Sequence, residues 1–186
     1  YIGSFTSVQG RQYTRPQYVN SLATLNVLYD KSILEKVGLF DETLASEAED
    51  AELNYRLRSS NYDLLFIPDS YVFHNMRSTP LNWFKNMFRY GKGRARLLKR
   101  NPNMWNVGYA LPLLFTLTMA TIFISPFNSY FLIGLLYFPT LLLYSVLISS
   151  KQSKVHLFAH VLVAYLAEHF GYTLGMIYGL SSSKVR

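Results

Sequence analysis

Two adjacent acids, Glu49 and Asp50, are the residues of this 186-residue chain whose types and spacing most directly predict chemistry. Ser46 and Glu49 match the capping-box pattern S-x-x-E, which predicts that a helix starts at Ser46 and that Glu49 bonds back to that start. Asp50 shares a helical stripe with Leu53 and Leu57, so we expect it to face the core or a cleft. A carboxylate held there could act as a general base toward an attacking hydroxyl group. The competing interpretation is that acids gather at a helix start because the helix dipole favours them.

Further candidates lie in and before a basic stretch, residues 85–100, which contains seven Lys or Arg residues and no acid. Arg89 could bind a diphosphate through its planar guanidinium, or it could be one more anchor in the basic run. Tyr90 could stack on a ring-shaped ligand, or it could be an aromatic residue of a membrane interface. His74 follows a predicted strand and could contact a diphosphate or a metal, or it could be structural.

Local signals predict the elements that would position these residues. Asp30 is a predicted N-cap and Gly38 a predicted left-handed C-cap of a short helix between them. Residues 1–20 are expected to form a loop. Strands are predicted over 24–29, 64–68 and 71–74.

A third helix is predicted to open at Thr79-Pro80, with proline in its first turn. Its aromatic face is ringed by basic residues, which is typical of a helix lying in a membrane interface. That face consists of Trp83, Phe84, Met87 and Phe88.

Long apolar runs dominate the second half of the chain. Residues 107–125 and 129–149 contain no charge, and both are long enough to span a bilayer. A third run, 155–180, contains Glu168 and His169, so it could span with its polar face against the other helices or lie partly in the interface. The two residues are candidates for a polar contact inside a helix bundle. Basic residues flank the two uncharged runs, which predicts that residues 30–100 face the cytoplasm. Within the third run Gly171, Gly175 and Gly179 recur every four residues, which predicts close packing against another helix.

Composition excludes several classes of protein. The formal net charge is +7, but ten of the 11 acids lie between Asp30 and Asp69, so the chain has an acidic segment followed by a basic one. The absence of cysteine excludes disulfides, thiol chemistry and zinc–thiolate sites within this sequence. Nucleic-acid binding fits the charge but not the apolar runs, so we do not expect it.

The ordered set of motifs resembles the acceptor half of family 2 glycosyltransferases. The family pattern G-G-F-D-E is matched by residues 38–42, with Leu39 in place of the second glycine, and E-D-x-E-L is matched by residues 49–53. The expected downstream proline and histidine are Pro68 and His74.

The basic stretch adds to this resemblance. Residues 86–90 are similar to the family motif Q-x-x-R-W, with Asn86 for Gln and Tyr90 for Trp. The form R-Y-G-x-G-R, which begins at Arg89, is similar to the membrane-bound, succinoglycan-biosynthesis-like branch.

The resemblance implies an α/β fold, namely the second half of a GT-A, Rossmann-like domain followed by an interfacial helix and two to three transmembrane helices. Three parts follow: an acceptor-side part of the glycosyltransferase domain (1–78), an amphipathic interfacial region (79–104) and a transmembrane region (105–186). The chain starts at Tyr1 and lacks a D-x-D motif, so we expect the nucleotide- and metal-binding half to lie upstream and this piece to be inactive alone.

The implied activity is inverting transfer of a sugar from a nucleotide-sugar to a lipid-linked or polysaccharide acceptor. The site would face the cytoplasm on a multi-pass cell-membrane protein, in contact with membrane lipid. A divalent metal, Mg or Mn, is expected in the full-length enzyme, but no residue of this chain is assigned to it. Asp50 would be the catalytic base, and the substrate-binding residues would be Glu49, His74, Asn86, Arg89 and Tyr90.

A non-enzymatic alternative stays open at this point. The basic stretch 85–100 could bind anionic lipid head groups without any enzymatic role. This interpretation explains the basic run equally well, but it leaves the acidic motif and His74 as coincidence.

Overall fold

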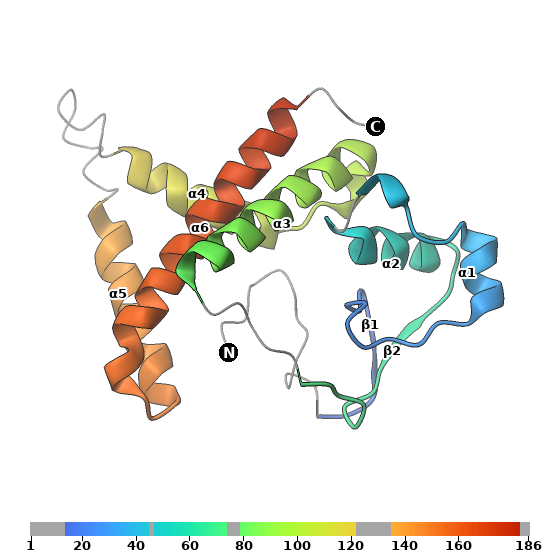
Figure 1. Ribbon diagram of the computed structural model, residues 1–186, viewed down its shortest axis with the longest axis horizontal. Coiled ribbons are helices and arrows are strands. Elements are labelled where there is room, and N and C mark those ends of the chain that lie inside the picture. The colour runs from blue at the N-terminus through green and yellow to red at the C-terminus, as the bar shows by residue number, and fades with distance from the viewer. Residues whose placement is uncertain (1–13, 45–46, 74–78, 122–134, 183–186) are drawn as a thin grey trace. The chain divides into compact units, whose positions relative to one another are not determined.

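The computed structural model describes residues 14–44, 47–73, 79–121 and 135–182 (Figure 1). This part of the chain is mostly helical, with one two-stranded sheet. It divides into an α/β unit (described residues 14–44, 47–73 and 96–105) and a helical unit (79–95, 106–121 and 135–182). The main elements are β1 Gln17–Val19, α1 Lys31–Val37, α2 Glu49–Ser59, β2 Leu64–Phe66, α3 Pro80–Arg100, α4 Val107–Ala120, α5 Tyr137–Lys151 and α6 Phe158–Ser181. Short 3₁₀ turns cover Glu42–Leu44, Pro102–Met104 and Val155–Leu157.

Helix α1 has the boundaries that its caps predicted. The carboxylate of Asp30 accepts hydrogen bonds from the backbone N–H groups of Ser32 at 2.8 Å and Ile33 at 3.3 Å. Gly38 ends the helix with φ of 93°, in the left-handed region that glycine adopts most easily. Both predicted caps are confirmed.

The sheet of the α/β unit differs from the one that the sequence predicted. β2 is confirmed, but its antiparallel partner β1 comes from the segment predicted as a loop, with Tyr18 opposite Leu65. No strand forms over 24–29 or over 71–73, and His74 lies outside the described residues. The described sheet is therefore a small antiparallel pair, not a parallel Rossmann-like sheet.

The core of the α/β unit lies between α2 and this sheet. Leu53 and Leu57, on the apolar stripe predicted for α2, are buried together with Leu64 of β2. Side chains from β1, α1 and the intervening loops pack around these three residues.

The helix start that the capping-box pattern predicted at Ser46 is wrong. The helix starts at Glu49, three residues later than expected, so Glu49 is its first residue. Ala48 occupies the N-cap position with φ of 88° and provides no side-chain hydrogen bond. Ser46 lies outside the described residues.

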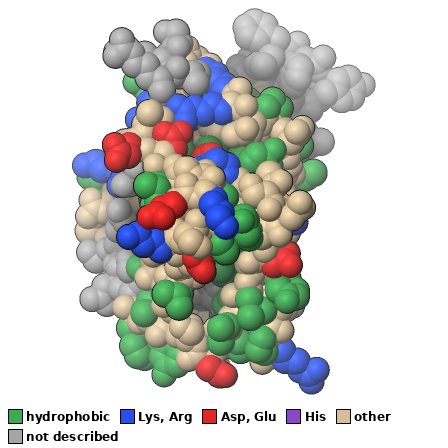
Figure 2. Space-filling model, turned by 90° about the vertical axis from the view of Figure 1, so that its right-hand side faces the viewer, with side chains coloured by type: hydrophobic (Ala, Val, Ile, Leu, Met, Phe, Trp, Pro, Cys, Tyr) green, Lys and Arg blue, Asp and Glu red, His purple; other side chains and the backbone are tan. Residues whose placement is uncertain are grey.

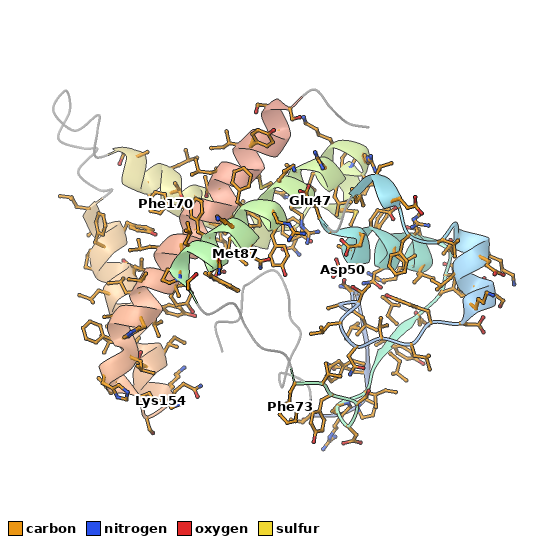
Figure 3. All side chains as sticks on the ribbon, in the orientation of Figure 1. Glu47, Asp50, Phe73, Met87, Lys154 and Phe170 are labelled. Carbon is orange, nitrogen blue, oxygen red and sulfur yellow. The ribbon has the colours of Figure 1, made fainter. Side chains whose placement is uncertain are left out.

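In the helical unit, α3 packs closely on α6 (Figures 1 and 3). The helix opens at Pro80 as predicted, and Met87 on its aromatic face is 3% exposed. The glycines of α6 meet the backbone of α3 in order: Gly171 faces Phe84, Gly175 faces Phe88 and Gly179 faces Lys92. The residue numbers rise together, so the two helices run parallel. The close-packing prediction for the three glycines is confirmed, and Met87 and Phe88 of the aromatic face also contact α6.

Helices α4 and α5 occupy parts of the apolar runs 107–125 and 129–149. As described, they are 14 and 15 residues long, and residues 122–134, which include part of each run, lie outside the described ranges. Within the described ranges, no helix is both long and apolar enough to span a membrane. The two to three transmembrane helices predicted from the sequence are therefore not found in this part of the chain.

The polar residues of the third apolar run have different surroundings. The Nδ1 atom of His169 lies 3.0 Å from the hydroxyl oxygen of Tyr137 on α5, so this residue makes the polar contact that its position predicted. Glu168 is buried, and its Oε2 atom makes no hydrogen bond among the described residues.

Candidate active site

Asp50 lies in the first turn of α2, directly after the helix start (Figure 3). Its side chain is partly buried, and its Oδ1 atom lies 2.7 Å from the backbone nitrogen of Ala51, which donates to it. Leu53 and Leu57 follow on the buried side of the helix. The carboxylate therefore lies at the edge of the packed core and is held by a hydrogen bond from the helix backbone.

The buried side chain of Asn54 connects α2 to the segment before α1 through hydrogen bonds. Asn54, one turn after Asp50, is fully buried, and its Nδ2 donates to the carbonyl of Leu22 at 2.6 Å and to the Ser21 hydroxyl at 2.9 Å. Its Oδ1 accepts a hydrogen bond from the Tyr29 hydroxyl at 3.1 Å. Burial, and then the nearby negative charge of Asp50, raise the pKa of Tyr29 to about 12. Tyr29, like an ordinary tyrosine, is a neutral hydroxyl at physiological pH, and the raised pKa keeps it neutral well above that pH.

A second acid of the motif, Glu52, is committed to an ion pair within α2. Its two carboxylate oxygens lie 2.7 and 2.9 Å from Nε of Arg56. The same guanidinium donates to the backbone carbonyls of Val37 and Leu39, on either side of Gly38. Arg56 thus ties the turn after α1 to the helix that carries Asp50.

Two acids in the segment between α1 and α2 are paired with the last turns of α3. Asp41 accepts from Arg100, whose other terminal nitrogen lies 2.8 Å from the hydroxyl oxygen of Thr43. The hydrogen bond from the Thr43 hydroxyl, and then those from the Thr43 backbone and Arg100, keep the pKa of Asp41 below its usual range. Glu47 lies 2.8 Å from Arg96. Figure 2 shows that acidic and basic side chains are interspersed on the face it presents.

The predicted site residues fall into two groups that belong to different units. Glu49 and Asp50 share the first turn of α2 in the α/β unit. Asn86, Arg89 and Tyr90 lie on α3 in the helical unit, where Asn86 is 6% exposed and Tyr90 is 51% exposed. Arg89 is exposed, and His74 lies outside the described residues. Their roles in substrate binding remain predictions.

The described residues do not fit a divalent metal. No group of three or more His, Asp or Glu side chains in the described ranges could hold one. Three other acids of the α/β unit are instead paired with arginines: Asp41 with Arg100, Glu47 with Arg96 and Glu52 with Arg56.

An open groove of about 290 Å³ lies in the α/β unit between α1 and the sheet. Its lining is mainly apolar, and the Tyr29 side chain that bonds Asn54 also reaches it. The acids on its lining are Asp30 and Asp63, so its charge does not suit a phosphate group.

Several residues that shape this site were not singled out from the sequence. The Glu52–Arg56 pair was readable, because opposite charges four residues apart on a helix commonly pair. Tyr29 and Asn54 are separated by 25 residues, and Glu47 and Arg96 by 49, so no local pattern could have joined them.

Comparison with known proteins identifies one similarity. A family model described as "Glycosyl transferase family group 2" matches residues 3–182. Neither the curated proteins nor the solved structures contain a match.

Proposed function

Since the match covers nearly the whole chain, the protein belongs to glycosyl transferase family group 2, and we propose that Asp50 is the general base of its sugar transfer. The proposed donor is a nucleotide-sugar, and the proposed acceptor is a lipid-linked or polysaccharide hydroxyl. One observation supports this role: Asp50 lies at the edge of the core in the first turn of α2. The next turn of the helix carries Asn54, which is hydrogen-bonded to Tyr29.

The proposed reaction is a single displacement. The Asp50 carboxylate takes the proton of the acceptor hydroxyl while the hydroxyl oxygen attacks the anomeric carbon. The bond from that carbon to the diphosphate oxygen breaks, and the nucleoside diphosphate leaves with the electron pair. One displacement from the opposite face inverts the anomeric configuration.

We propose that residues on α3 bind the substrates. Arg89 is suited to the diphosphate because its guanidinium can donate two parallel hydrogen bonds to phosphate oxygens. Tyr90 is exposed, and its ring can stack on a sugar of the acceptor. We also propose roles in substrate binding for Glu49, His74 and Asn86. No step is assigned to a metal, since the described residues do not fit one.

We further propose that the protein works at the cytoplasmic face of the cell membrane, in contact with lipid. Support comes from large apolar side chains exposed on the helical unit, which would be costly to leave in water. They include Leu114, Leu117, Phe138, Leu143, Leu147 and Ile177. In a cysteine-free version of the protein, a cysteine placed at exposed Asn61 gives a clean label, and the present sequence already contains no cysteine. Labelling by a membrane-impermeant reagent should require permeabilised cells, and labelling of intact cells would reject the proposed orientation.

The alternative role as a simple lipid binder is less well supported than the enzyme. It needs the basic stretch 85–100 to be available to head groups. Several of its side chains have partners within the protein: Arg94 lies over the Tyr109 ring at 4.0 Å, and Arg96 and Arg100 are paired with acids.

The role of Asp50 as the base is tested with the Asp50→Asn variant of the full-length protein. Its rate of sugar transfer is measured in membranes. The substitution keeps the shape and removes the basicity, so turnover should fall by about 10² or more, with donor affinity nearly unchanged. Glu49→Gln changes the adjacent acid, and Glu35→Gln changes an exposed acid on α1 as a control. Full activity of Asp50→Asn would reject the assignment. A loss in Glu49→Gln alone would move the base to Glu49.

A further inference from the structure

The backbone at the start of α2, directly before the turn that carries Asp50, has an unfavourable conformation. Ala48 is in the left-handed region at φ of 88°, a conformation that costs a residue with a Cβ atom about 1–2 kcal/mol. Ala48, the N-cap residue, makes no side-chain hydrogen bond to the helix. The N-cap residue therefore does not hold the first turn, and a contact from another residue is needed to keep Asp50 in one position.

The ion pair between Glu47 and Arg96 meets this need. Glu47 immediately precedes Ala48, and its side chain is only 9% exposed. Arg96 is 22% exposed, and the two groups are 2.8 Å apart. A carboxylate this far from water requires a partner, and Arg96 supplies it.

A second pair fixes the same segment further upstream. Arg100 lies one helical turn after Arg96 on α3, and it bonds both Asp41 and Thr43 in the turn that leads toward α2. Two arginines on one side of α3 therefore hold the segment between Asp41 and Glu47 at both of its ends.

We propose that Arg96, supported by Arg100, is a positioning residue for glycosyl transfer: it anchors Glu47 and thereby sets the place of Asp50. The inference rests on the proposed role of Asp50 as the base. Arg96 acts through Glu47 and does not itself touch the reacting groups. Misplacement of a catalytic group by about 1 Å can cost roughly 10² in rate, so even a partial shift of α2 should be measurable.

The variants that test this are Arg96→Ala, which removes the anchor, and Arg96→Lys, which keeps a positive charge within reach of Glu47. Lys31→Ala is the matched control, because Lys31 forms an ion pair with Glu35 in the same unit, but both side chains are largely exposed. Arg96→Ala should lower kcat by about tenfold or more at an unchanged KM for the donor. Arg96→Lys should recover most of that loss, and Lys31→Ala should stay within about twofold of wild type.

Two further measurements separate positioning from general destabilisation and from failure of the base assignment. In the Asp50→Asn background Arg96→Ala should cause little additional loss, because two changes that act through one group are not additive. Amide hydrogen exchange should speed up over residues 47–53 in Arg96→Ala while α1 keeps its protection.

The outcomes are distinguishable. A wild-type kcat in Arg96→Ala, or exchange that rises equally across the whole α/β unit, would overturn the positioning role. Full activity of Asp50→Asn would instead remove the proposed base, while the exchange measurement would still decide whether Arg96 holds the start of α2.

Discussion

The substitution Gly175→Ala tests the helix pairing on which the helical unit depends. A Cβ atom on Gly175 would lie 2.0 Å from the backbone oxygen of Phe88 and 2.8 Å from its carbonyl carbon. The first distance is roughly 1.4 Å shorter than the 3.4 Å at which ordinary contact begins. The obstructing atoms belong to the backbone of α3, so no side-chain rotation can relieve the clash, and the helices must separate.

Two opposing effects set the magnitude. Alanine is favoured over glycine inside a helix by about 1 kcal/mol, which alone would stabilise the variant. Overpacking a tight interface costs about 1–3 kcal/mol, and the short backbone distance places Gly175 at the upper end of that range. The net expectation is a loss of about 1–2 kcal/mol, or roughly 2–8 °C in Tm for a chain of this size.

The assay is thermal or denaturant unfolding of the purified protein under one fixed set of conditions. Leu174→Ala is the control, because Leu174 is the adjacent residue of α6 and is 46% exposed. It should change the free energy of unfolding by no more than about 0.5 kcal/mol. A Gly175→Ala protein that is as stable as wild type, or more stable, would refute the close α3–α6 contact, because helix propensity would then act unopposed.

Three other substitutions test the site and its supports. Leu39→Gly should raise the free energy of unfolding by up to about 1 kcal/mol, because Leu39 has φ of 57°, which glycine adopts more easily. The control Leu25→Gly, at an exposed position without positive φ, should not raise the free energy of unfolding. The lowered pKa of Asp41 means that its stabilising contribution is present above the unfolded-state pKa and is lost as the pH falls through the folded-state pKa. Asp41→Asn should therefore be less stable than wild type at pH 6, with a difference that shrinks toward pH 3; a constant gap in unfolding midpoints would contradict this. Arg89→Lys should lose much of the transfer activity, because a lysine cannot donate two parallel hydrogen bonds to a diphosphate. Lys85→Ala, which changes an exposed residue of the same helix, should lose little. Equal transfer rates in the two variants would mean that Arg89 does not bind the diphosphate.

Local features of the fold were predictable wherever the interaction spans only a few residues. Asp30 and Gly38 bound α1 because a cap depends on the hydrogen-bonding capacity of one side chain and on the backbone freedom of one glycine. The buried stripe of Leu53 and Leu57 follows from helical spacing. The Ser46–Glu49 pattern was equally local, yet α2 starts at Glu49, and a distant ion pair with Arg96 holds Glu47 two residues before that start.

The sequence by itself indicated which residues could carry chemistry and which helix face could pack closely. It placed Asp50 on the apolar side of a helix and assigned Gly171, Gly175 and Gly179 to one close-packed face, because the side-chain types and the helical period suffice for both. Only the tertiary structure decided the partners. It paired β1 with β2, put α3 against the glycines, and joined Arg96 to Glu47 across 49 residues. Such contacts depend on how distant segments meet in space, and side-chain chemistry alone allows many pairings among the acids and bases of this chain.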